Sequence, residues 1–557
     1  MTDDPSEEKP QSERNISTAK VEDSILVTGN ENVITIQAPQ TRELSPLHQL
    51  PAPPQDFTGR AEEIQDLLAN FHRGVAISGL RGQGGVGKTA LALKLSEIIK
   101  DRYPDAQFFL DLGGVSANPL SAADAMAHVI RAYHPLAKLP DGEDELSAIY
   151  RSLLHEKRAL LVMDNAKDRR QVEPLLPPAG CVLIVTSRQH FTLPGLYDRD
   201  LDALPMEDAR ELLLRIAKRI GDCADEIAAL CGRLPLALRV AASAIAERRN
   251  LSPADYARRL RDAKQRLSHL KAVEVVLNES CELLDEESRK RWLRLAVFAK
   301  TFDESAAAAM WEMEADGVNE GLGDLLTYSL IEYDEASSRY SLHDLARIFA
   351  DGRLSEEERD AAKRRHARHY CQTLEQAKEL YLQGGEGVKR GVALFDGERA
   401  NIEAGWEWAE SLAERDDEAA ELCLEYPNAG VYVLDLRQHP REQIRWLNCQ
   451  LAAARRLKKR DYEGADLGNL GNAYADLGET RKAIEFYEQA LVIDREIGDR
   501  RGEGAALWNM SLSLDKLGER ARAIECAEAS LKIREEIEDP RAEKVREQLA
   551  EWRQKDE

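Results

Sequence analysis

Residues 82–89 read Gly-Gln-Gly-Gly-Val-Gly-Lys-Thr, a full match to the pattern G-x-x-x-x-G-K-[ST]. A loop of this kind follows a strand, opens a helix and points its backbone amides at phosphate oxygens. Here the apolar run 75–78 precedes it, and residues 90–99 after it have helical periodicity. The pattern therefore predicts a strand-loop-helix unit that binds a nucleoside triphosphate with magnesium. We expect the phosphates to be held by Gly82, Gly84, Gly85, Val86, Gly87, Lys88, Thr89 and Ala90.

Three further apolar runs, at residues 107–110, 159–163 and 182–185, are separated by helical stretches and predict parallel strands covered on both faces. Asp164 follows the second run, and the third run leads into Thr186-Ser187-Arg188. Open α/β sheets bind ligands at the carboxyl ends of their strands. We therefore expect Thr89 and Asp164 to hold the metal, and Arg188 to lie beside the γ-phosphate together with Lys88.

Length and charge bound the class of protein. The chain has 557 residues, of which 43% are hydrophobic, enough for roughly three to five domains. The formal charge of −24 disfavours non-specific nucleic-acid binding. No run approaches the ~18 apolar residues of a membrane span, and the first residues are acidic, so we expect a cytoplasmic protein. The eight scattered cysteines form no C-x-x-C pair and predict buried reduced thiols.

Six motifs occur in a fixed order along residues 55–352. They are Phe57-Thr58-Gly59-Arg60, the phosphate loop, Leu161-Val162-Met163-Asp164-Asn165, Thr186-Ser187-Arg188, Gly232-Arg233-Leu234-Pro235-Leu236 and Leu342-His343-Asp344. The set resembles the NB-ARC module of the signal-transduction ATPases with numerous domains. That resemblance implies an adenine-nucleotide switch, in which ADP holds a closed monomer and ATP opens it for assembly.

The resemblance also implies roles for single residues. Arg60, with its neighbours Phe57 and Gly59, would pack beside the adenine and ribose, and Pro235 would cap the base. Arg188 would sense the γ-phosphate, whereas His343 would contact the β-phosphate of ADP. Since His343 lies in a separate predicted domain, its contact exists only when the module is closed, so Arg188 and His343 favour opposite states. For a lone histidine, a place in the core or on the surface is the alternative.

One position departs from many relatives, which carry a second acid after the aspartate of the third motif. This chain has Asn165 there, and an amide cannot act as a base for the attacking water. We therefore expect slow ATP hydrolysis, suited to a switch, and leave open which residue orients the water.

The C-terminal part contains an internal repeat. Leu477-Gly478-Glu479 recurs as Leu517-Gly518-Glu519, and Ala483-Ile484-Glu485 recurs as Ala523-Ile524-Glu525, each at an offset of 40 residues. The units resemble tetratricopeptide repeats, with about six residues more than the usual ~34. We place the extra residues near 498–502 and a weaker unit around residues 444–447. The repeats predict a sensor or docking surface, and a helical stalk that only covers the switch is the alternative.

The N-terminal part has a different character. Residues 1–20 are polar and charged, residues 24–37 hold two short β-prone runs, and a proline cluster at 51–54 predicts a stiff linker. The β-prone segment resembles the short amyloid-type signalling motifs found at the ends of some prokaryotic switch ATPases. A hairpin packed on the ATPase domain is the alternative.

These observations predict a multidomain α/β and all-α protein. We divide it into a leader (1–20), a β-prone motif (21–40), a Pro-rich linker (41–55), a P-loop nucleotide-binding domain (56–200), a helical domain (201–268), a winged-helix domain (269–352), a helical connector (353–410), tetratricopeptide-like repeats (411–545) and a charged tail (546–557).

The predicted function is an ATP/ADP-dependent signalling switch in prokaryotic immunity or programmed cell death. We expect it to sense a protein trigger through its repeats and to form a homo-oligomer that recruits an effector. A transcription regulator is the first alternative, although residues 271–351 contain 18 acidic and 8 basic residues, a net charge of −10 that disfavours DNA binding. A metabolic ATPase or kinase is the second alternative, and no motif for an acceptor substrate supports it.

Overall fold

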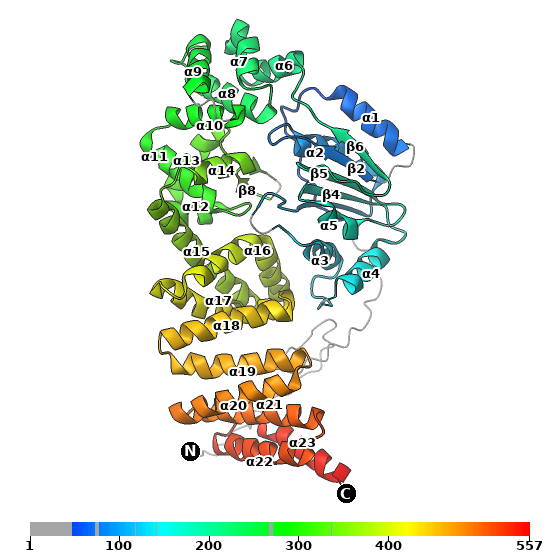
Figure 1. The fold of residues 1–557 in the computed structure, drawn as a ribbon, viewed down its shortest axis with the longest axis vertical. Coiled ribbons are helices and arrows are strands. Elements are labelled where there is room, and N and C mark those ends of the chain that lie inside the picture. Colours follow the sequence, from blue (N-terminus) through cyan, green and yellow to red (C-terminus); the bar gives the residue numbers. More distant parts are fainter. Residues whose placement is uncertain are drawn as a thin grey trace, which may run out of the picture. The chain divides into compact units, whose positions relative to one another are not determined.

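The computed structural model describes residues 47–72, 77–116, 119–140, 142–266, 271–335 and 337–556. The first part is a six-stranded sheet in the order β1-β3-β4-β5-β2-β6, with every neighbouring pair parallel (Figure 1). The strands are β1 (Leu47–His48), β2 (Ile77–Arg81), β3 (Ala106–Asp111), β4 (Ala159–Ala166), β5 (Val182–Ser187) and β6 (Leu196–Asp200). The predicted strands at 107–110, 159–163 and 182–185 are confirmed.

Helices cover both faces of this sheet, which explains the continuous apolar runs. Along β4, Leu160 and Val162 belong to the core shared with α2, whereas Leu161 and Met163 belong to the core shared with α3 and α4. Alternate side chains of a strand point to opposite faces, so a run buried on both sides is apolar at every position. The covering helices are α1 (Ala61–His72), α2 (Lys88–Ile99), α3 (Ala122–Tyr133), α4 (Glu143–Leu154) and α5 (Arg169–Val172).

Two predominantly helical regions follow the sheet. The first contains α6 (Met206–Ile216), α7 (Ala224–Leu230), α8 (Pro235–Glu247), α9 (Pro253–Arg266) and α10 (Ala272–Leu283). The second is the winged-helix region, with α11 (Glu286–Arg294), α12 (Glu304–Trp311), α13 (Ala315–Thr327), the hairpin β7 (Glu332–Asp334) and β8 (Arg339–Ser341), and α14 (Asp344–Asp351). This region thus has helices followed by a short hairpin and a last helix.

The remaining helices pack against one another in chain order. They are α15 (Glu356–Leu382), α16 (Glu386–Leu412), α17 (Asp417–Arg437), α18 (Pro440–Arg456), α19 (Arg460–Asp476), α20 (Thr480–Ile497), α21 (Arg500–Lys516), α22 (Arg520–Glu536) and α23 (Ala542–Asp556). The 40-residue repeat is visible in repeated ion pairs, because Glu463 binds Arg455 at 2.8 Å and the equivalent Glu503 binds Arg495 at 2.7 Å.

Three expectations from the sequence need correction. The extra length of the repeat lies in its helices, since only Gly498 and Asp499 separate α20 from α21. The prediction of a charged tail is wrong, because residues 546–556 belong to α23. This helix buries Trp552, since its apolar residues recur on one helical face. Leu47 was expected in the Pro-rich linker, but it lies in β1, which pairs with the edge of the sheet at Ala106. The predicted leader and β-prone motif lie outside the described residues.

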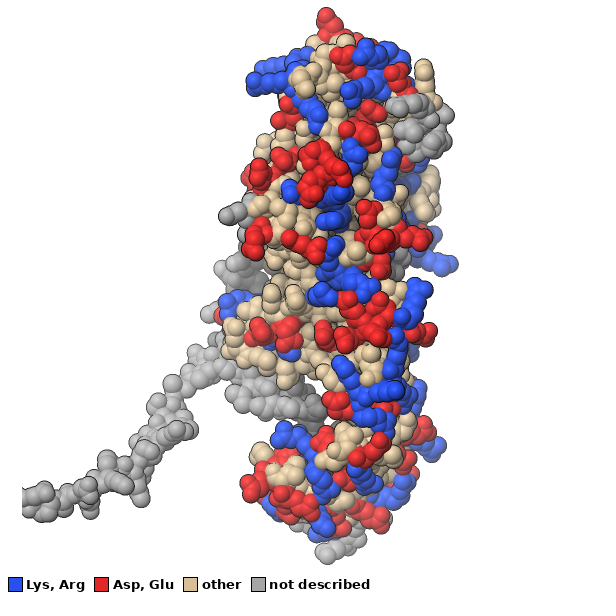
Figure 2. Space-filling model, turned by 90° about the vertical axis from the view of Figure 1, so that its left-hand side faces the viewer, with Lys and Arg blue, Asp and Glu red and all other residues tan. Residues whose placement is uncertain are grey.

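Acidic and basic side chains are interspersed over the described residues on the face that Figure 2 shows, and this face has no broad basic area. That distribution gives a nucleic-acid backbone no continuous electrostatic footprint there. Within the described part of the chain, no helix combines the length and the apolar character needed to cross a membrane.

Candidate functional site

The phosphate loop joins β2 to α2 at the carboxyl edge of the sheet. Its backbone needs glycine, because φ is +78° at Gly85 and +95° at Gly87. Lys88 begins α2, and its ammonium group donates to the carbonyl oxygens of Gly82 at 2.8 Å and Gln83 at 3.0 Å. The loop therefore curls around the lysine nitrogen, as the motif predicts.

The electrostatics of this loop suit an anion. Burial, followed by the charge of Arg188, lowers the pKa of Lys88 to about 8, although Asp164 and Asp344 oppose the shift. The positive charges of Lys88 and Arg188 thus repel each other in this site. A phosphate group placed there would neutralise both, so the residues fit a nucleotide.

The predicted metal ligands lie in direct contact with each other. The Thr89 hydroxyl donates to the two carboxylate oxygens of Asp164 at 2.9 and 3.0 Å, and the Thr186 hydroxyl donates to the same carboxylate at 2.6 Å. Burial, and then the charge of Asp111, raises the pKa of Asp164 to about 6. A cluster of hard oxygen ligands whose negative charge is poorly compensated fits Mg²⁺.

Sequence reasoning missed Asp111 as a member of this cluster. Asp111 ends β3, and the sheet register places it opposite Asp164 of β4. Only the order of the strands identifies it, since the sequence shows an aspartate after an apolar run but not that β3 and β4 are neighbours. Its side chain also accepts a bond of 3.4 Å from the Asn165 amide.

Asp344 connects the winged-helix region to the nucleotide edge of the sheet. Its Oδ2 atom accepts bonds from Arg188 Nη2 at 3.2 Å and from Asn165 Nδ2 at 3.1 Å. The other oxygen, Oδ1, pairs with Arg347 of its own helix at 2.5 Å. The structure therefore brings together Arg188, Asn165 and Asp344, which the sequence assigned to three separate motifs.

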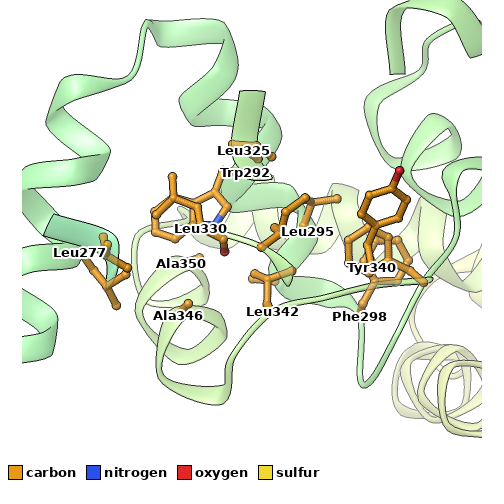
Figure 3. Packing of buried hydrophobic residues seen from close by; sticks show 14 of the residues in the cluster. Leu277, Trp292, Leu295, Phe298, Leu325, Leu330, Tyr340, Leu342, Ala346 and Ala350 are labelled. Carbon is orange, nitrogen blue, oxygen red and sulfur yellow. Dashed lines mark hydrogen bonds between the residues drawn. The ribbon is translucent and has the colours of Figure 1, made fainter. Parts of the chain in front are cut away.

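Helix α14 is held in place by the apolar core of the winged-helix region (Figure 3). Leu342, Ala346 and Ala350 are buried in this core with Trp292, whose indole nitrogen donates to the Leu330 carbonyl at 3.3 Å. Because these residues recur on one face, the helix is fixed in rotation. Its first turn is consequently presented to the phosphate loop, where a Cβ on Gly84 would lie 3.1 Å from the Leu345 side chain.

His343 caps the N-terminus of α14, with Nδ1 accepting from the Leu345 amide at 3.1 Å. Burial is the largest cause that lowers the pKa of His343 to about 4; the charges of Arg188 and Lys88 act in the same direction, and Glu332 opposes them. The imidazole is therefore neutral near pH 7. Since Nδ1 accepts, the proton lies on Nε2, which is the form that can donate to a phosphate oxygen.

Pro235 and Arg60, which were predicted for the base and ribose, lie next to the phosphate loop. Pro235 begins α8, and a Cβ on Gly87 would lie 3.5 Å from the Pro235 ring. The Arg60 guanidinium is bound to the protein itself, with bonds to the Val86 carbonyl at 3.0 Å and the Asp202 carbonyl at 2.6 Å. Arg60 thus supports the phosphate loop by its bond to the Val86 carbonyl.

Phe57 and Gly59 lie in the segment that leads to Arg60. The ring of Phe57 packs against the core, and its carbonyl accepts from Arg215 at 3.1 Å. Gly59 has a φ of +76°, and a Cβ there would overlap the Asp208 carboxylate. Ala90 lies in the first turn of α2 and is partly buried.

Fold and site together define a P-loop α/β protein joined to a helical repeat region. Residues 462–536 match the family model of the tetratricopeptide repeat. The chain is similar to the regulatory protein AfsR of Streptomyces griseus and of Streptomyces coelicolor, with 36% identity in each case over 63% of this chain and 37% of the relative. It is also similar to the disease resistance protein RML1A of Arabidopsis thaliana, at 26% identity over 62% of this chain and 36% of the relative.

These matches agree with the resemblance drawn from the sequence motifs, and the family model confirms the tetratricopeptide repeats at residues 462–536. The chain spans a little over a third of the length of the curated relatives it matches. Among solved structures, a signal transduction ATPase with numerous domains from Pyrococcus horikoshii that carries a tetratricopeptide repeat sensor aligns with a TM-score of 0.43 at 15% identity, over 89% of this chain and 86% of the other.

Proposed function

We propose that this chain is an adenine-nucleotide switch whose closed state is held by Asp344. The observation that carries the proposal is the bridge from Asp344 to Arg188 and Asn165, which joins the winged-helix region to the edge of the nucleotide site. Arg188 is the residue expected to meet a γ-phosphate. The closed state and a bound triphosphate therefore compete for the same guanidinium.

The direction of the switch follows from charge. A γ-phosphate beside Arg188 would offer that cation a stronger partner and would place further negative charge near the Asp344 carboxylate. ATP thus disfavours the closed state. A diphosphate leaves the Arg188–Asp344 pair intact and can accept a bond from Nε2 of His343, so ADP favours the closed state.

Within the site, each residue has a distinct task. Lys88 would neutralise charge on the β- and γ-phosphates, and Thr89 and Asp164 would hold Mg²⁺, which supplies charge neutralisation for phosphoryl transfer when bound. Asn165 donates to Asp344 and cannot accept a proton from water, so we expect slow hydrolysis. The protein would then act as a timer with little sustained turnover.

We further propose that the repeats receive a trigger, that the ATP-bound chain assembles into a homo-oligomer in the cytoplasm, and that the N-terminal segments recruit an effector. A role in immunity or programmed cell death is supported by the similarity to a plant disease resistance protein. Tethered segments act by raising local concentration. Deleting residues 1–40 should preserve nucleotide affinity and abolish signalling, and signalling that survives would remove this segment as the output.

A second candidate is a regulatory protein that controls transcription, and the 36% identity to two Streptomyces regulatory proteins favours it. The net charge of −10 in residues 271–351 argues against DNA binding by the winged-helix region itself. A mobility shift with random-sequence duplex at low salt separates the candidates. Retarded duplex that is released at high salt would favour the regulator.

The first experiment is to denature freshly purified protein and to resolve the released nucleotide by chromatography. Near-stoichiometric ADP supports a closed switch that awaits exchange. The same preparation is then exchanged into ATP or ADP and its mass measured by light scattering. An empty site with rapid, steady ATP turnover and an unchanged mass would refute the switch.

A further inference from the structure

A second cavity lies away from the phosphate loop, between the nucleotide-binding region and the helices that precede the repeats. Its volume is about 530 Å³, and its walls include Arg131 of α3, Arg399 and Trp406 of α16, and Arg437 of α17. Two cross-region bonds frame it: Arg399 pairs with Asp124 of α3 at 3.0 Å, and Arg437 donates to the Pro135 carbonyl at 2.7 Å. Figure 1 shows α3 beside α16.

Three buried donors around this cavity have no hydrogen-bond partner among the described residues. They are Nε of Arg131, Nη1 of Arg437 and Nε1 of Trp406. Arg437 is only 3% exposed and Trp406 only 1% exposed. Buried donors are normally satisfied, and an arginine left without a full set of acceptors is costly. Water or a bound molecule can supply the acceptor atoms that these donors lack among the described residues.

Charge points to the same conclusion. Burial, followed by the neighbouring charges of Arg437 and Arg399, lowers the pKa of Arg131 to about 10, although Asp396 and Asp124 oppose the shift. Arg437 and Arg399 have carboxylate partners, Asp396 and Asp124, but no hydrogen bond of Arg131 to a carboxylate is found in the described residues. An oxyanion between these guanidinium groups would satisfy the donors and relieve the repulsion.

The cavity also has acceptors. The carboxylates that line it are Asp124, Glu403, Glu407, Asp435, Glu442 and Asp476, and burial raises the pKa of Asp476. Carboxylates in this setting accept bonds from hydroxyl or amino groups. A cavity of this size holds a small metabolite and excludes a folded partner.

We propose that this cavity binds a small organic oxyanion, a phosphate ester or a carboxylate, that also carries hydroxyl groups. The anion contacts Arg131, Arg437 and Trp406, and the hydroxyl groups contact Asp435 and Asp476. Since the occupant touches both α3 and the helices α16 and α17, it strengthens the contact between the two regions. This last consequence rests on the proposed switch, whereas the binding itself does not.

The test uses the full chain saturated with ADP and Mg²⁺, so that the phosphate loop is occupied. Glucose 6-phosphate and malate serve as probes of the two oxyanion classes, and binding is measured by calorimetry and by tryptophan fluorescence. We expect one of them to bind with a dissociation constant below about 1 mM, and Arg131→Gln to weaken that binding at least tenfold. Preference for one probe identifies the phosphate or the carboxylate class.

Two controls make the result specific. Arg151→Gln, on the exposed side of α4, should leave binding unchanged. Arg131→Gln removes no hydrogen bond of Nε, so its melting temperature should equal or exceed that of the parent. Absence of binding by both probes up to 10 mM, or binding that Arg131→Gln leaves intact, would overturn the proposal. Normal ADP content with no probe binding would reject this site alone and leave the switch untouched.

Discussion

Replacing Asp344 with valine tests the closed state directly. The substitution removes two bonds that cross from the winged-helix region to the nucleotide edge, from Arg188 at 3.2 Å and from Asn165 at 3.1 Å, and keeps the bond from Lys300 to the Asp111 carbonyl at 3.0 Å. It also leaves Arg188 close to Lys88 with Asp164 as the remaining carboxylate that opposes the lowering of the Lys88 pKa. The variant should therefore favour the open state and bind a γ-phosphate more tightly.

The magnitude follows from the burial of the pair. The side chains of Arg188 and Asp344 are 26% and 18% exposed, so their bond is only partly screened by solvent. Hydrogen bonds that involve a charged group contribute about 1.5–3 kcal/mol. Taking about 2 kcal/mol for the bridge, because solvent reaches both groups, the closed state should lose about 30-fold in population relative to the open state.

The assay is the release rate of a fluorescent ADP analogue chased with excess ATP. If release requires opening, Asp344→Val should accelerate it by about 30-fold. Asp351→Val is the matched control, since Asp351 lies on the same helix and pairs with Arg359 of α15 at 3.0 Å. An acceleration below about threefold, or an equal effect in the control, would refute the bridge as the lock. A double-mutant cycle with Arg188→Gln then isolates the pairwise coupling.

Three further substitutions test the fold and the site. Lys88→Ala should lower the affinity for ADP and ATP at least tenfold in equilibrium dialysis, and unchanged affinity would remove the phosphate-loop assignment. Trp552→Ala should destabilise the last repeat helices by about 3–5 kcal/mol in thermal unfolding, whereas Glu547→Ala on the exposed face should have little effect. Asp466 is buried and its pKa is raised to about 8, so the folded state favours the protonated acid and loses stability as pH rises from 3.8 towards 8. Asp466→Asn should therefore raise the free energy of unfolding by about 2–4 kcal/mol at pH 8 and leave it unchanged at pH 4. Equal gains at both pH values would contradict this explanation.

Local patterns were enough to predict much of the nucleotide site. The spacing of residues 82–89 predicts the loop, and the apolar run at 159–163 predicts a strand buried on both faces, because these signals depend only on neighbouring residues. Asp164 and Arg188 were found for the same reason: the ends of parallel strands meet at one edge. The 40-residue repeat likewise predicts the stacked helical pairs.

The misses have a common cause. The charged appearance of residues 546–556 hid the buried face of α23, whose Trp552 stacks against Trp508 at 6.5 Å between ring centroids. Asp111 became a site residue only because β3 and β4 are neighbours in the sheet. Composition describes a segment by itself, whereas burial depends on what packs against it.

The sequence by itself determined the phosphate loop, the parallel strands and the repeat, since each is encoded within a few turns of chain. Only the tertiary structure decided that Asp344 meets Arg188 across 156 residues and that Arg131 and Arg437 share one cavity. Those contacts depend on how separately folded regions pack, and no periodicity in the chain records that packing. The Asp344 bridge of the proposed switch and the proposed oxyanion site both depend on such contacts between regions.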